Sequence, residues 1–285
     1  LRYRLMFLIT LILGLVAMQF PFVAAILLWI YMAKTAVVGI QSPLIVLGPF
    51  FLAPVVLILV DSAAGTALQG LDSIMGVGIP ALVFLLCLIR QQRTTTSLAC
   101  ASGALVLYGS ARAYFFAEYL GQIQQAVQEQ LNQMLPELMN QDLYAQSMDL
   151  MVYLMPGFWI AFQVVAMIIG LVLFHRQLSL PFLWNRIQFP WQYNLLFVLG
   201  SALYLIPGQQ VVFIAAMLGL SVLPMMQGVS LLISYLSRII MNKVMRAIIL
   251  IAMLVNSISF IILAFIGFID IWFNLRKIET GGSPA

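Results

Sequence analysis

The stretch VVFIAAMLGLSVLPMMQGVSLLISYL, residues Val211–Leu236, decides the fold class, because it contains no charged side chain over 26 residues. An α-helix rises about 1.5 Å per residue, so a run of this length can cross a hydrocarbon core about 30 Å thick. The whole chain has the same bias, with 64% hydrophobic and 8% charged residues among 285. Soluble domains carry about 25% charged residues. We therefore predict an all-α, polytopic bundle of transmembrane helices whose first partner is the lipid bilayer.

Eight further apolar runs accompany this one. They are Leu5–Phe20, Phe22–Ile40, Leu44–Val60, Ile74–Ile89, Ser97–Ala117, Met151–Phe174, Trp191–Ile206 and Ala247–Trp272. Together the runs predict about nine membrane segments. Eight is the alternative, if Trp191–Ile206 is re-entrant or interfacial. The expected organisation is an N-terminal membrane bundle at 1–117, an external region at 118–149, a C-terminal membrane bundle at 150–277 and a flexible tail at 278–285.

The charged residues segregate along the predicted topology. With the N-terminus in the cytoplasm and nine crossings, ten basic residues fall inside: Arg2, Arg4, Lys34, Arg90, Arg93, Arg176, Arg186, Arg238, Lys243 and Arg246. The acidic residues up to position 149 all fall outside. The positive-inside rule favours this orientation. Arg276 and Lys277 are the exception, since nine crossings leave them outside.

The external region is rich in glutamine. Gln122, Gln124, Gln125, Gln128, Gln130 and Gln133 alternate with apolar residues at intervals of three and four. This spacing predicts an amphipathic helix, or a helical hairpin if Pro136 and the cluster Asn140-Gln141-Asp142 break it. Two interpretations stay open: a helix lying on the outer leaflet, and a lid or docking surface on the external side.

Most classes of enzyme and cofactor protein are disfavoured. The sequence has no nucleophile elbow, zinc-protease motif or phosphate-binding loop. With two cysteines and one histidine it offers no Cys/His metal site. We therefore expect no catalytic activity, no metal and no cofactor. The dispersed basic residues suit membrane orientation and do not predict nucleic-acid binding.

Arg112, in the stretch YGSARAYFF, is the sharpest candidate for a ligand-binding residue. An ionisable side chain inside a membrane is costly, so such residues are often functional. Arg112 either extends to the outer interface or faces a cavity that Tyr108 would help to line. In the second case it pairs with an anionic ligand or with one of three acidic residues: Asp61, Asp72 or Asp149.

Three amides are expected in the middle of predicted spans. Gln163, Gln227 and Asn256 either form hydrogen bonds between helices or line the same cavity as Arg112. Hydrogen bonds of the first kind stabilise a membrane bundle by about 1 kcal/mol or less each. Both roles remain open at this stage.

The chain ends its last apolar run with GFIDIWFNLRK, residues Gly267–Lys277. Trp272 and Phe273 suit an aromatic belt at the membrane surface, and Arg276 with Lys277 suits the polar edge beyond it. Asp270 lies six and seven residues before those cations, too far for a one-turn helical pair. We expect Asp270 to cap another helix or loop, and the stretch to be either an anchor or a functional site.

This ending resembles the C-terminal signature of the YybS-like family of bacterial inner-membrane proteins. NRIQFPWQYNLLFVLG (185–200) and MMQGVSLLISYLSR (225–238) resemble segments of the same family in the same order. The family's usual ending has an acidic residue where this chain has Asn274. The resemblance implies a bacterial cytoplasmic membrane location. It also implies a distant fold-level similarity to the substrate-binding subunits of energy-coupling-factor transporters and to MreD.

Two functions are compatible with these observations. The first is a transporter-like subunit that binds a small solute or a lipid and has no nucleotide site, so that a partner ATPase or an ion gradient would supply energy. The alternative is a non-transporting scaffold or assembly factor for a cell-envelope complex. A ligand-sized cavity favours the first, and a filled core with an external apolar groove favours the second.

Overall fold

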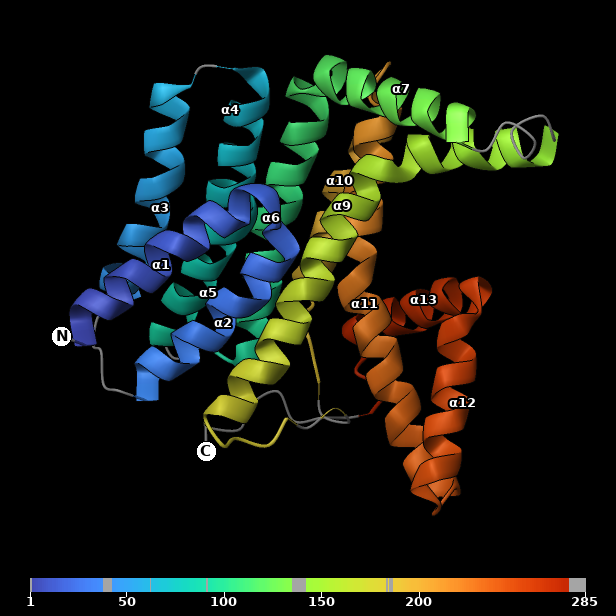
Figure 1. The fold of residues 1–285 in the computed structure, drawn as a ribbon. Coiled ribbons are helices and arrows are strands. Elements are labelled where there is room, and N and C mark those ends of the chain that lie inside the picture. Colours follow the sequence, from blue (N-terminus) through green and yellow to red (C-terminus); the bar gives the residue numbers. More distant parts are fainter. Residues whose placement is uncertain are drawn as a thin grey trace.

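The computed structural model describes residues 2–37, 43–61, 63–90, 92–134, 142–182, 184 and 187–276. The prediction of an all-α protein is confirmed: 88% of the described residues are helical, and none of them lies in a strand. The helices are α1 (Arg2–Gln19), α2 (Pro21–Val37), α3 (Pro43–Val60), α4 (Ala64–Leu71), the π-helix η1 (Asp72–Gly78), α5 (Ile79–Ile89), α6 (Thr94–Phe115), α7 (Ala117–Met134), α9 (Asp142–Gln177), α10 (Tyr193–Ala202), the 3₁₀-helix η3 (Leu203–Leu205), α11 (Gln210–Ile239), α12 (Lys243–Val255) and α13 (Ser257–Phe273) (Figure 1).

The prediction of about nine membrane segments, or eight, is wrong. Within the described part of the chain, three helices are long and apolar enough to cross a membrane: Ala64–Ile89, Leu150–Gln177 and Gln210–Ile239. The bent pair Lys243–Met253 and Ile258–Phe273 makes a fourth if it counts as one span. The coarser expectation stands, since these helices are compatible with a location in a membrane.

Helix length explains most of the difference. Four apolar helices have only 10–17 residues within the part whose side chains the structure describes: Arg4–Gln19, Pro21–Lys34, Leu47–Val60 and Tyr193–Leu205. A helix of 17 residues extends about 25 Å, less than a hydrocarbon core of about 30 Å. Helix α6 is long enough, but its Thr, Ser and Gly residues and Arg112 lower its hydropathy.

Two further boundaries differ from the expected ones. The last run breaks at Asn256, whose side chain accepts a hydrogen bond from the Ile258 N–H at 3.0 Å and caps α13. The two parts of this run meet at a bend of 105°. Conversely, Asp72 does not border a loop, because α4, η1 and α5 form one continuous helix. The loop before α4 is held by Asp61. Hydrogen bonds from the Thr66 hydroxyl and the Ala63 N–H lower the pKa of its carboxyl.

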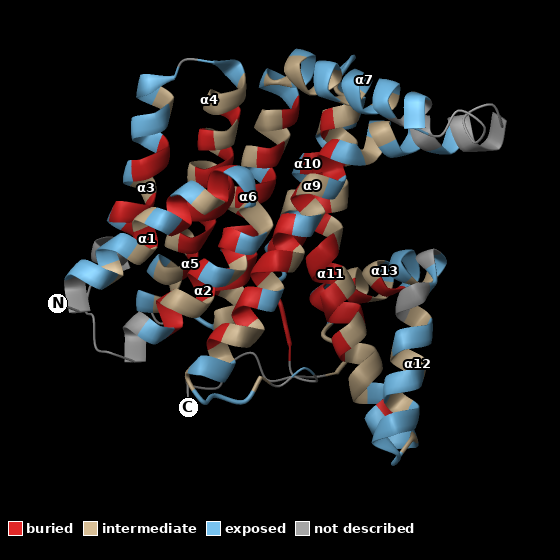
Figure 2. Ribbon diagram, in the orientation of Figure 1, coloured by how far each residue is buried: buried red, intermediate tan, exposed pale blue. Residues whose placement is uncertain are grey.

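The core lies between α2, α5, α6, α9 and α11, where Figure 2 shows most of the buried residues. Helix α9 is central to it, since it packs against α2, α6 and α11. Trp29 of α2 stacks on Phe84 of α5 at 4.1 Å between ring centroids, and Phe84 meets Phe174 of α9 at 5.8 Å. Burial of such large aromatic side chains is what joins the N-terminal helices to α9.

Helices α11 and α13 pack with their backbones in close contact. A Cβ atom on Gly228 would lie 2.0 Å from the Leu263 carbonyl oxygen, and one on Gly267 would lie 1.8 Å from the Pro224 carbonyl oxygen. Only glycine fits at such a contact, as in other closely packed membrane helices. This crossing fixes α13 against α11 and so positions the C-terminal ending.

The glutamine-rich region forms α7, which lies across one end of the bundle beside the first part of α9 (Figure 1). Gln124 ties the two helices together, donating to the Val152 carbonyl at 3.0 Å. Helix α9 then continues without interruption through the domain boundary expected at 149/150. Residues 135–141, which include Pro136, lie outside the described part, as does the tail from 277 to 285.

Candidate functional site

Arg112 of α6 forms an ion pair with Asp72 of η1. Its Nε lies 2.7 Å from Asp72 Oδ1 and its Nη2 lies 3.1 Å from Oδ2, a bidentate geometry. Tyr108, one helical turn before Arg112, donates its hydroxyl to the same Oδ1 at 2.7 Å. Of the alternatives left open for Arg112, the structure shows pairing with an acidic residue, and the partner is Asp72.

The ion pair is largely shielded from solvent and packs against an aromatic side chain of a neighbouring helix. The side chains of Arg112 and Asp72 are 11% and 10% exposed, and the guanidinium carbon lies 4.5 Å from the centroid of Trp159 on α9. An aromatic ring attracts a cation stacked on its face, and the attraction is stronger when the cation is partly desolvated. Asp72 opens a π-helix, a form often found at functional sites. The pair therefore joins η1, α6 and α9, and its two charges compensate each other.

The C-terminal ending forms a second polar cluster. Asp270, fully buried, accepts Arg276 Nη2 at 2.8 Å and Gln227 Nε2 at 2.6 Å. The spacing of six residues excludes only a one-turn helical pair, and Arg276 reaches Asp270 from beyond the end of the helix. Helix α13 ends at Phe273, and Asn274 takes a left-handed conformation (φ 44°) that turns the chain back over the helix. Asparagine tolerates this conformation better than most residues.

Several groups complete this cluster. Arg276, whose side chain is 6% exposed, also donates to the Ser230 hydroxyl and the Ile187 carbonyl. Gln227 additionally donates to Gln188 Oε1 at 2.8 Å and accepts the Phe189 N–H at 3.1 Å. The cluster thus holds α13 to α11 and to the buried, non-helical segment 187–190. Non-helical backbone at membrane depth needs such internal partners.

The remaining predicted residues lie apart from both ion pairs. Gln163 is fully buried on α9, and neither of its amide atoms has a hydrogen-bond partner among the described residues. Asn256 is exposed at the bend between α12 and α13. Trp272 and Phe273 are exposed at the end of α13, in agreement with a membrane-facing position, and Lys277 lies outside the described part. Neither of the two cavities described below has Arg112, Gln163, Gln227 or Asn256 in its lining.

A cavity does exist on another face of α6. It has a volume of about 510 Å³ and lies between α6, α10 with η3, and α11. Its lining is mostly apolar: Gly103, Val106, Leu107, Ser110, Ala111, Tyr114, Leu196, Leu199, Gly200, Leu203, Ile206, Gln209, Val212, Ala216 and Leu220. None of these residues is charged. Sites for small molecules usually have about this size and composition.

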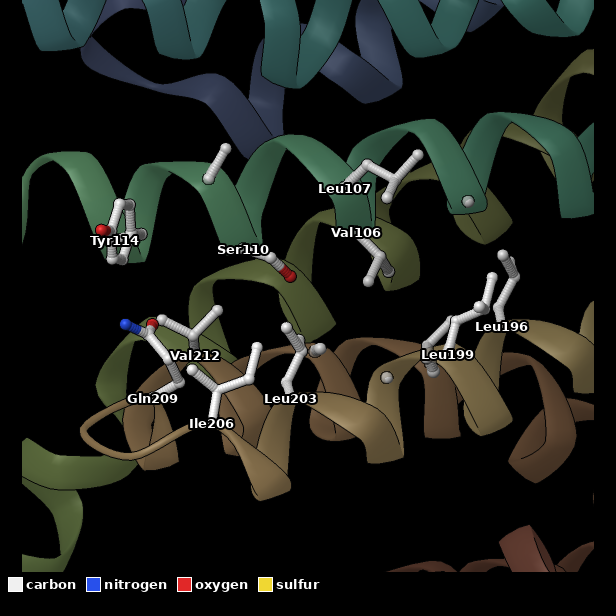
Figure 3. A pocket seen from close by; sticks show the side chains of 15 residues that line it. Val106, Leu107, Ser110, Tyr114, Leu196, Leu199, Leu203, Ile206, Gln209 and Val212 are labelled. Atoms are coloured by element: carbon white, nitrogen blue, oxygen red, sulfur yellow. The ribbon is translucent and has the colours of Figure 1, made fainter.

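The polar groups of the cavity gather toward one end. Figure 3 shows Tyr114 and Gln209 close to each other there, while Leu196 and Leu199 lie at the other end. The Ser110 side chain points into the cavity between these two ends. Tyr114 is one residue from the end of α6, and Gln209 directly precedes α11, so the polar end is at the helix termini. Leu107 and Leu199 are 69% and 66% exposed, which leaves the cavity open to the side.

Sequence reasoning missed this cavity. The signal was present in α6, where Gly103, Leu107, Ser110 and Tyr114 follow at intervals of three and four and form one stripe. The stripe does not reveal its partner, because α10 and α11 follow about 80 residues later.

Among the described residues, no group of three or more His, Cys, Asp or Glu could hold a metal ion.

The site therefore consists of an uncharged, laterally open cavity and two buried ion pairs that position the helices around it. Comparison with known proteins adds no assignment to this geometry: no protein family, curated protein or solved structure matches the chain.

Proposed function

We propose that this chain is an integral membrane protein of transporter-like type that binds a lipid or another long-chain amphiphile in the cavity between α6, α10 and α11. It would act as a binding subunit with neither catalytic activity nor a nucleotide site of its own. The observation that carries the proposal is the cavity itself. It combines a ligand-sized volume, an uncharged lining and a lateral opening among apolar helices.

The distribution of polar groups favours an amphiphile over a uniformly apolar molecule. The Tyr114 hydroxyl and the Gln209 amide can bind a weakly polar headgroup at the helix termini, where a membrane surface would lie. The leucine-lined part can hold a chain. From Gly103 to Tyr114 the cavity follows α6 for about 16 Å at 1.5 Å per residue. With no charged residue in the lining, the cavity disfavours a strongly charged headgroup.

Native mass spectrometry of the full chain purified in a mild neutral detergent tests the proposal. The wild-type protein is expected to carry a bound amphiphile that survives extraction. Ala111→Phe, which places a ring inside the cavity, is expected to remove that adduct because the ring occupies the same volume. Ala247→Phe, the same change at an exposed position on α12, is the matched control.

Equal retention of the amphiphile by the wild type and both variants would contradict the proposal, since the cavity would then not be where it binds. Loss of the adduct from Ala111→Phe alone supports it. Both variants must elute as folded monodisperse protein, which a thermal melt in the same detergent checks.

We also propose that the end of the bundle carrying Lys34, Arg90 and Arg176 faces the cytoplasm, and that the opposite end with Asp61 and α7 faces outward. The resemblance to the bacterial YybS-like family stays a prediction, and this orientation agrees with it. In a protein lacking Cys87 and Cys100, a membrane-impermeant maleimide on intact cells should label Ala63→Cys and not Gln92→Cys. The reverse pattern would overturn the orientation.

A further inference from the structure

A second cavity lies at the other end of α11 from the amphiphile cavity. It has a volume of about 490 Å³ and is lined by Leu231, Ser234, Tyr235, Arg238, Leu275 and Arg276. Four of these residues belong to the last three turns of α11, and the other two follow α13 directly. The two cavities share no residue, so the inference drawn from this one is independent of the proposed function.

The two arginines of this cavity differ in their electrostatic state. The charge of Arg276 is compensated by Asp270, with which it pairs at 2.8 Å. Arg238 has neither an ion pair nor a hydrogen bond to its side chain within the described part of the chain. Nothing nearby in sequence can supply one, because no Asp or Glu occurs between Asp149 and Asp270. Among the residues that the structure describes, the cavity therefore has one positive charge without an acidic partner.

The carboxylate of Asp270 is not available to Arg238. It already accepts hydrogen bonds from Arg276, from Gln227 and from the Leu275 N–H. Lys243, in the first turn of α12 shortly after Arg238, adds a further positive charge at this end of the bundle. An anion placed in the cavity would thus meet a net positive field.

The hydrogen-bonding groups suit a phosphate. A guanidinium offers several donors in a planar arrangement that matches phosphate oxygens, and the Ser234 and Tyr235 hydroxyls can add two more donors. Leu231 and Leu275 supply an apolar wall beside these donors. That combination fits a phosphate group carried by an apolar molecule.

We propose that this cavity binds the phosphate group of an anionic membrane lipid, with Arg238 as the principal cationic contact and Ser234 and Tyr235 as further donors. Basic pockets at one end of membrane helices bind such headgroups in other proteins. Free phosphate is the other source of the same chemistry, and the experiment separates the two.

The test measures binding of phosphatidylglycerol and of phosphatidylcholine with the same acyl chains to the full-length protein in neutral detergent. The wild type is expected to prefer phosphatidylglycerol. Arg238→Gln should weaken phosphatidylglycerol binding about fivefold and leave phosphatidylcholine binding unchanged, because one surface cation is lost. Arg238→Lys should retain most of the preference. Arg90→Gln, which removes a charge from an exposed arginine on α5, is the control.

Inorganic phosphate distinguishes the sources. If millimolar phosphate displaces phosphatidylglycerol from the wild type, the site recognises the phosphate group alone; if it does not, the lipid chain is required as well. Either result supports the site when Arg238→Gln is selectively weakened. Equal losses in Arg238→Gln and Arg90→Gln, or no preference for phosphatidylglycerol in the wild type, would overturn it.

Discussion

The carboxylate of Asp270 accepts hydrogen bonds from Gln227 of α11 and from Leu275 and Arg276 in the segment that follows its own helix. Removing a partner from a buried ion pair leaves an uncompensated charge, which typically costs about 3–5 kcal/mol. Asp270 is fully buried and its partner Arg276 nearly so. Replacing either of these two residues should therefore lower the stability of the protein more than replacing a charged residue on the surface.

At this scale we predict that Arg276→Gln destabilises the protein by about 3–5 kcal/mol, because Asp270 stays buried without its cation. Thermal unfolding in detergent measures the loss. Arg246→Gln, at a less enclosed position on α12, should change the midpoint little. A midpoint for Arg276→Gln equal to that of Arg246→Gln would show that the pair does not stabilise the fold. The double variant Asp270→Asn, Arg276→Gln should be less destabilised than the two single losses add up to.

The Asp270–Arg276 pair also shows why residue-level contacts were hard to predict. A helical projection separates the two residues, and only the left-handed turn at Asn274 brings Arg276 back. Arg112 was easier, because pairing with one of three acidic residues was among the alternatives that the sequence offered. The choice of Asp72 as the partner depends on the π-helix η1, which no sequence pattern predicted.

At the scale of elements, the contact between α11 and α13 decides where the C-terminal ending lies. Gly228 and Gly267 allow the two backbones to meet, and a methyl group at either position would overlap a carbonyl oxygen. Helix α13 then holds Asp270 against Gln227. The close approach and the polar cluster therefore depend on each other.

We predict that Gly228→Ala lowers stability by at least about 1–3 kcal/mol, because the added methyl group overpacks the contact and separates the helices. Gly121→Ala on α7 is the control, since its Cβ would meet nothing within 4 Å. That control should leave the melting temperature unchanged or raise it slightly, because alanine favours a helix more than glycine does. Equal melting curves for both variants would contradict the crossing.

Element boundaries were only partly predictable. Val211–Leu236 and Met151–Phe174 lie inside α11 and α9, because long uninterrupted apolar runs leave no alternative to a helix. The run Ala247–Trp272 looked equally continuous, yet Asn256 caps a new helix inside it. Trp191–Ile206 became a short helix after a buried extended segment, a result that depends on tertiary hydrogen bonds to Gln227.

At the scale of the molecule, charge and hydropathy predicted an all-helical, membrane-compatible chain but not the cavity. The cavity arises where α6 meets α10 and α11, elements that tertiary packing alone brings together. Its ends differ in polarity, and the second cavity at the opposite end of α11 is basic. The account therefore describes one bundle with an uncharged amphiphile site near one end and an anion site near the other.

The most direct test of the central claim, the amphiphile site, is photo-crosslinking with a lipid that carries a diazirine in its acyl chain, followed by peptide mapping. The account predicts labelling concentrated in residues 103–114 and 196–220, and its loss in Ala111→Phe. Surface lipid would instead label the exposed apolar faces of α1 and α3 to a similar extent. Uniform labelling of these helices, unchanged by Ala111→Phe, would contradict the account.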